Sequence, residues 1–307
     1  MKNNKITFSQ FLSVCFLSCL SSVMFISRTP SVFVLLTSVL ALFVNYAVFM
    51  LYKGQLKKVL IPVSIVYLSF YCVITVVKFA DYMNTALSYG PDCLIIIALL
   101  CFTFFCTVKG GEALSRASTV IFVFVIAGLI YMLVCTFTNI NFKLTVDFPD
   151  EIISSVILFF PSLLYIINYD NIINVKPKLY AVYSGILVAA LAYFILIASG
   201  INSAYPIQHL PAISKIGVFK GSDCILLSIL TISSVFSVSS STVSIFKNSK
   251  HNYLTHSIYI AVLLGISIIV SLFKLLGFIE NYVFMPFSVV VMLIIILLCA
   301  VKRKNYV

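Results

Sequence analysis

The sequence predicts an all-α integral membrane protein with about ten transmembrane helices in a single domain. Of its 307 residues, 62% are hydrophobic and only 9% are charged, and the mean hydropathy is +1.15. Such a chain has too few polar side chains to cover a water-soluble surface. A helix needs roughly 20 apolar residues to cross about 30 Å of hydrocarbon. Runs of about this length cover approximately residues 8–27, 32–52, 59–79, 92–108, 117–137, 152–168, 179–199, 223–246, 257–276 and 283–301.

The first of these runs has the features of a secretory signal, because Lys2 and Lys5 precede an apolar stretch. However, Ser27-Arg28-Thr29-Pro30 is a poor cleavage site, which requires small residues, and the run is long for a signal core. We therefore expect residues 8–27 to form a retained helix.

The connections between the runs leave no room for a soluble catalytic module. The longest of them covers only about residues 200–222, so we treat residues 1–307 as one transmembrane domain. The sequence contains no glycine-rich phosphate loop, no nucleophile elbow and no CxxC pair. We expect neither an enzyme nor a cofactor or metal site, and we interpret the nine cysteines as small buried apolar side chains.

The basic residues indicate the orientation of the chain. When the ten runs are threaded with the N-terminus inside, most of the 20 basic residues fall on the cytoplasmic side and most of the acidic residues fall outside. Both termini are therefore predicted to be cytoplasmic. The net charge of +11 then reflects topology and attraction to the anionic lipid of the bilayer, and we expect no nucleic acid as a partner. The cytoplasmic set comprises Lys2, Lys5, Lys53, Lys57, Lys58, Lys109, Arg116, Lys176, Lys178, Lys247, Lys250, Lys302, Arg303 and Lys304.

Ten helices divide into two halves of five, about residues 8–137 and 152–301. Because five is odd, the second half enters the membrane upside down, which makes a 5+5 inverted repeat. In transporters of this kind the first helix of each half is interrupted, and its free backbone groups hold the ligand. Ser21-Ser22 in the first run and Pro161-Ser162 in the sixth are the expected interruptions. Simple proline kinks and serine packing are the alternatives.

A hydroxyl-rich face of residues 223–246 and an aromatic in residues 59–79 complete the predicted ligand site, although either could equally be packing. Every charged residue, including Lys78 and Glu280, is expected towards the end of a run, which disfavours a strongly charged ligand. A zwitterion remains suitable, since backbone N–H groups can bind its carboxylate and carbonyls its ammonium. The predicted ligand residues are Ser21, Ser22, Met24, Phe25, Tyr71, Phe159, Phe160, Pro161, Ser162, Ser234 and Ser237.

The stretch KFADYMNTALSYGPDCLIIIALLCFTFFCTVKGGEALSRAS, from Lys78 to Ser118, resembles the B subunits of the spore germinant receptors. These proteins are a branch of the amino acid, polyamine and organocation transporter superfamily. Gly110, Glu112 and Arg116 match the family's Gly-x-Glu-x-x-x-Arg pattern. KITFSQFLSVCF, HLPAISKIG and MPFSVVVMLIIILLCAVKRKN resemble further segments of the family. The chain departs from the pattern in its short connection between the fifth and sixth runs, its lack of tryptophan, and the absence of Arg-x-Glu near residues 220–223.

The resemblance implies a leucine-transporter-like fold in the inner membrane of a spore. It also implies an A-type subunit and a lipoprotein C-type subunit as partners, and a small nutrient of the amino acid class as the ligand. Two alternatives stay open. The protein could be an amino acid permease that works by alternating access, or a scaffold subunit that binds nothing.

Overall fold

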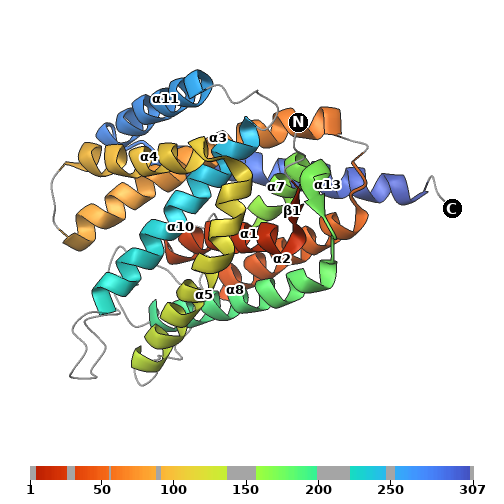
Figure 1. The fold of residues 1–307 in the computed structure, drawn as a ribbon, viewed down its shortest axis with the longest axis horizontal. Helices are drawn as coiled ribbons and strands as arrows, with labels where there is room; N and C mark the ends of the chain where they lie inside the picture. Colours follow the sequence, from red (N-terminus) through yellow and green to blue (C-terminus); the bar gives the residue numbers. More distant parts are fainter. Residues whose placement is uncertain are drawn as a thin grey trace.

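The computed structural model describes residues 5–25, 32–54, 57–87, 91–136, 157–198, 222–246 and 253–304. Helices account for nearly all of this part of the chain (Figure 1). The longer helices are α1 (Phe8–Met24), α2 (Val32–Leu51), α3 (Lys57–Leu87), α4 (Asp92–Val108), α5 (Gly110–Thr136), α8 (Pro177–Ala198), α10 (Ser222–Ile245), α11 (Tyr253–Leu272) and α13 (Met285–Lys304). The shorter elements are β1 (Ile6–Thr7), η2 (Ile157–Phe159), α7 (Phe160–Asn168), η3 (Tyr169–Asn171), β2 (Ile172–Ile173), α12 (Leu276–Phe278) and the π-helical η5 (Ile279–Phe284).

Seven helical segments in the described part of the chain are long and apolar enough to cross a membrane. Two further apolar helices, α1 and α4, have 17 residues each. The outward faces of the bundle are apolar, as Phe43, Phe105 and Phe124 illustrate with 67%, 68% and 72% exposure. Such faces suit contact with lipid tails. The prediction of an all-α, multi-pass membrane protein is confirmed.

Most of the predicted runs are close to the helices. Residues 92–108 coincide with α4. The run 32–52 differs from α2 by one residue at its end, and the run 223–246 differs from α10 by one residue at each end. The largest errors lie where a helix continues beyond its apolar run. Helix α3 extends to Leu87 rather than to residue 79, and α5 begins at Gly110 rather than at residue 117. Backbone hydrogen bonding continues through polar residues, so hydropathy alone does not find these ends.

Helix α1 forms the centre of the molecule. Fifteen of its 17 residues are buried, and it packs against α5, α7, α8 and α10. In Figure 1, α1 lies near the middle of the view, with α10 beside it, α4 and α11 on one side and α8 on the other. A helix that is buried all round belongs to the core of a bundle.

A short parallel strand pair, which the sequence analysis did not predict, fixes how α1 and α7 lie. Ile6 pairs with Ile172 and Thr7 with Ile173. Thr7 also caps α1, because its hydroxyl accepts from the Gln10 N–H (3.4 Å) and its N–H donates to Gln10 Oε1 (3.1 Å). Since β1 precedes α1 and β2 follows α7, the start of α1 and the end of α7 lie side by side. Phe11 near the start of α1 also packs on Tyr165 near the end of α7, and α1 contacts η2 at the start of α7, so the two helices run in opposite directions.

Candidate ligand site

Helix α1 is continuous where an interruption was expected. It is α-helical from Phe8 to Met24, and the Phe25 N–H bonds to the Ser21 carbonyl at 3.1 Å. The predicted break at Ser21-Ser22 is therefore wrong. The Ser21 hydroxyl donates to the Ser18 carbonyl at 2.9 Å, and a serine that bonds back to its own helix in this way is compatible with an unbroken backbone.

Tyr71 joins three helices at the centre of the bundle. Its hydroxyl donates to the Ser18 carbonyl of α1 at 3.0 Å and lies 3.1 Å from Ser22 Oγ. Its ring centroid is 4.5 Å from that of Phe160 at the start of α7. Tyr71 is fully buried, and a buried tyrosine hydroxyl needs such partners. The structure thus brings three of the predicted ligand residues, Ser22, Tyr71 and Phe160, into one cluster.

Pro161 lies in the first turn of α7. The chain approaches as the 3₁₀ turn η2 and becomes α-helical at Phe160. A proline in the first helical turn has no N–H to leave unpaired, so it is tolerated there at little cost. The part of the predicted run before residue 157 lies outside the described residues. The predicted interruption of a span at Pro161-Ser162 therefore remains a prediction.

Asn45 of α2 binds the backbone at this junction. Its Nδ2 donates to the Leu158 carbonyl at 2.6 Å, and its Oδ1 accepts from the Ser162 N–H at 3.1 Å and also from the Ser162 hydroxyl. In a regular α-helix that carbonyl and that N–H would bond to each other. The Asn45 amide occupies both groups and so stabilises the change from 3₁₀ to α geometry.

The sequence analysis missed Asn45, although a signal for it was present. It is a lone amide within the apolar run 32–52 and is fully buried in α2. Amide side chains in membrane helices commonly form hydrogen bonds across to neighbouring helices. The sequence could therefore have indicated a partner for Asn45, but not which partner.

The other predicted ligand residues are buried but do not all reach this cluster. Met24 is fully buried, and Phe25 packs on Tyr82 of α3 with ring centroids 6.1 Å apart. Ser234 and Ser237 lie in α10, which packs against both α1 and α3. Between α10 and α1, the observed side-chain contact is that of Ser240 with Ser18, at 3.1 Å. The hydroxyls of Ser233, Ser234, Ser237 and Ser239 are buried without a hydrogen-bond partner among the described residues.

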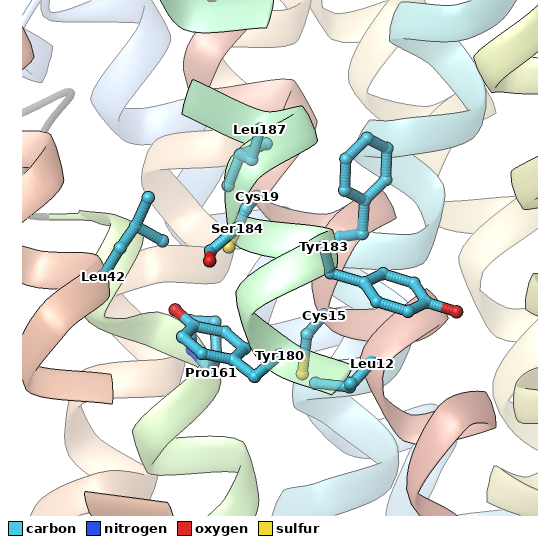
Figure 2. Close-up of a pocket in the computed structure, with 10 residues that line it drawn as sticks. Leu12, Cys15, Cys19, Leu42, Pro161, Tyr180, Tyr183, Ser184 and Leu187 are labelled. Atoms are coloured by element: carbon cyan, nitrogen blue, oxygen red, sulfur yellow. The ribbon is translucent and has the colours of Figure 1, made fainter. Parts of the chain in front are cut away.

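Two cavities flank α1 and α7. The first has a cavity volume of only about 10 Å³, and Pro161, Cys19 and Tyr180 are among the residues that line it. Figure 2 shows side chains from α1, α2, α7 and α8 gathered around this space. The second, of about 40 Å³, lies among α1, α5, α7 and α10, and Asn168 and Ser244 help to line it. The residues lining the two cavities include Pro161 but not Ser22 or Tyr71.

The family motif lies at the start of α5 and not in a loop. Lys109 alone separates α4 from α5, and Gly110 has φ of +82°, a left-handed conformation that favours glycine. Glu112 and Arg116 form an exposed ion pair one turn apart, and pairs of this kind add little stability. These three residues shape the connection and lie apart from the Tyr71 cluster along the chain.

A buried ion pair is the second feature that the sequence analysis missed. Lys78 Nζ of α3 lies 2.5 Å from Glu280 Oε1 of η5, and the two side chains are only 6% and 4% exposed. The sequence analysis expected both residues towards the ends of their runs, but it did not predict that both side chains would be buried. Because α3 continues to Leu87, Lys78 lies inside the helix, where η5 covers it.

No family model matches the chain, and no curated protein matches it either. Within the described residues, no group of three or more histidine, cysteine or acidic side chains is close enough to hold a metal ion.

Proposed function

We propose that this protein is the transporter-like membrane subunit of a nutrient germinant receptor, and that it binds a small amino acid between α1 and the start of α7. The resemblance of the segment from Lys78 to Ser118 to the receptor B subunits supports the assignment. The spore inner membrane, cytoplasmic termini, and A-type and lipoprotein C-type partner subunits belong to the same proposal.

One observation carries the ligand site: the backbone at the start of α7 is bound by a side chain, beside a cavity. The Leu158 carbonyl and the Ser162 N–H both bond to Asn45, and Pro161 lines the adjacent cavity of about 10 Å³. A carbonyl and an N–H are the groups that an ammonium and a carboxylate require. A zwitterion bound here would replace Asn45 at both backbone groups and would itself have to bond to the displaced Asn45 amide, because that side chain is fully buried. Since the space beside Pro161 has about the size of one water molecule, the site must widen to admit the ligand.

The opposite directions of α1 and α7 support the 5+5 inverted repeat as part of this proposal. The first helices of two inverted halves run antiparallel. Helices α1 and α7 do so, because the start of α1 meets the end of α7 at the β1–β2 pairing and α1 also contacts η2 at the start of α7. In such a fold a ligand that binds one arrangement of the halves more tightly shifts the population towards it. Partner subunits would then respond to that shift.

The scaffold alternative also has an observation in its favour. Helix α1 is continuous, and the Tyr71 and Ser22 hydroxyls already bond within the bundle. A packed cluster of this kind needs no ligand to satisfy its polar groups. The permease alternative uses the same cluster, so only a functional measurement separates the three readings.

The test compares two tyrosine substitutions in a strain that lacks the native gene. Tyr71→Phe removes a hydroxyl that bonds to the Ser18 carbonyl at 3.0 Å. The matched control, Tyr193→Phe, removes a buried hydroxyl that bonds to the Met132 carbonyl, also at 3.0 Å, between α8 and α5. We expect both variants to assemble and only Tyr71→Phe to weaken germination across a panel of nutrients.

Each alternative predicts a different result. Normal nutrient responses for both variants, in a strain whose germination depends on this gene, would favour the scaffold. Counterflow of labelled amino acids in vesicles that contain the purified protein alone would favour the permease. Deletion of the gene without any change in germination would overturn the proposal.

A further inference from the structure

Among the buried side chains of the described residues, Lys78 and Glu280 are the only lysine, arginine, aspartate or glutamate. Lys78 lies nine residues before the end of α3, which places it about 13 Å from that end. Glu280 is the second residue of η5. The pair therefore connects α3 to η5, the segment that leads into α13.

Stability does not explain this pair. Removing two charges from water costs several kcal/mol per ion, and an apolar pair of similar volume is often as stable or more stable. Ionisable residues within membrane segments instead mark paths or binding sites for ions and protons. A buried carboxylate whose Oε1 lies 2.5 Å from a lysine ammonium therefore suggests a functional role.

The backbone around Glu280 is irregular. Residues Ile279–Phe284 form a π-helix, a rare geometry that is frequent at functional sites. Just before it, Lys274 has φ of +52°, which is uncommon for a residue other than glycine. The side-chain links between η5 and α3 include the ion pair and the contact of Phe284 with Tyr67, whose ring centroids are 4.9 Å apart. A shift of this short segment would separate the two charges.

Glu280 is the buried acidic side chain among the described residues of η5 and of the elements packed against it. On α3, Asp81 is exposed, while Tyr67 and Tyr82 are buried. Helix α12 carries no titratable side chain, nor does α13 over residues 285–297, and Tyr282 of η5 is 73% exposed. Lys78 is thus the cation that faces Glu280 from the elements packed against η5.

We propose that Glu280 is a proton-binding site, with Lys78 as its counter-charge. While η5 lies against α3, the Lys78 ammonium stabilises the carboxylate. When η5 moves away, the carboxylate loses its counter-charge, accepts a proton from hydronium and releases water, so that the group becomes neutral. Return of η5 to Lys78 releases that proton to water. Each cycle of this movement then binds and releases one proton.

This site differs from the proposed nutrient site, although α3 carries residues of both. Lys78 is seven residues after Tyr71, about 10 Å along the helix. The test below needs no nutrient, so proton binding can fail while the proposed function stands, and the reverse also holds.

The experiment uses the purified full chain in lipid vesicles and compares infrared spectra in mildly alkaline and mildly acidic buffers. We expect the carbonyl band of one buried carboxylic acid to grow on acidification. Glu280→Gln should remove this band. The control Glu112→Gln, which changes the exposed partner of Arg116, should keep it.

Two substitutions of Lys78 test the counter-charge. An opposite charge within hydrogen-bond range lowers the proton affinity of a carboxylate about tenfold to a thousandfold. Lys78→Gln should therefore raise the proton affinity of Glu280 by about that factor, whereas Lys78→Arg should change it only a few-fold. If Glu280→Gln does not fold, this comparison is sufficient by itself.

Three results would overturn the proposal. The first is a carboxylic acid band that persists in Glu280→Gln. The second is equal proton affinity in Lys78→Gln and Lys78→Arg. The third is the absence of any such band in the wild-type protein before circular dichroism shows that the helices unfold.

Discussion

Replacing Asn45 by leucine gives the sharpest test of the α7 junction. Leucine has nearly the same size, so the change removes hydrogen bonds and leaves the packing of α2 almost unaltered. The bonds lost are those to the Leu158 carbonyl, the Ser162 N–H and the Ser162 hydroxyl. Interhelical hydrogen bonds of this kind contribute about 0.6–1 kcal/mol each. We therefore expect Asn45→Leu to lower the free energy of unfolding by about 2–3 kcal/mol.

Ser38→Ala is the matched control on the same helix. Ser38 is fully buried and lies seven residues before Asn45, but its hydroxyl donates only to the Val34 carbonyl of its own helix, at 2.6 Å. Its removal should cost less than about 1 kcal/mol, because that carbonyl keeps its helical partner. Reversible unfolding in mixed micelles, followed by far-ultraviolet circular dichroism, measures both variants. Equal losses for Asn45→Leu and Ser38→Ala would refute the assignment of Asn45 as the residue that stabilises the junction.

A double-mutant cycle separates the side chain of Ser162 from its backbone. Ser162→Ala removes the hydroxyl that bonds to Asn45 but keeps the N–H that does so. The effects of Asn45→Leu and Ser162→Ala on the free energy of unfolding should therefore be non-additive by about 0.5–1 kcal/mol. Full additivity would mean that the Ser162 hydroxyl does not contribute to the interaction.

Two further substitutions test the backbone at other positions. Pro161→Ala should change the free energy of unfolding by less than about 1 kcal/mol, because Pro161 lies in the first turn of α7. In a helix interior a proline costs about 3 kcal/mol. A change of that size in the same unfolding assay would contradict the placement of Pro161 in the first turn. Gly110→Ala should destabilise the protein by about 1–2 kcal/mol because of the positive φ at Gly110. Gly185→Ala, in open space on α8, should be neutral or stabilising by up to about 1 kcal/mol, and a similar loss in both variants would argue against a left-handed requirement at Gly110.

The apolar runs predicted the helices because a membrane span must be apolar over its length, however the helices pack around it. That is why residues 92–108 coincide with α4, and why the class of protein followed from composition. Local reasoning failed at Ser21-Ser22, since the sequence does not reveal whether a serine hydroxyl bonds to its own helix, as Ser21 does, or to a ligand.

Only the tertiary structure decided which buried polar groups are partners. Asn45 and Leu158 are 113 residues apart, and Lys78 and Glu280 are separated by 202 positions in the chain. Hydropathy is a property of neighbouring residues, so the sequence by itself determined where the chain can enter the membrane. The pairing of an amide with a helix start, or of a lysine with a glutamate, depends on how distant helices pack, because the burial that makes these contacts matter exists only once the bundle has formed.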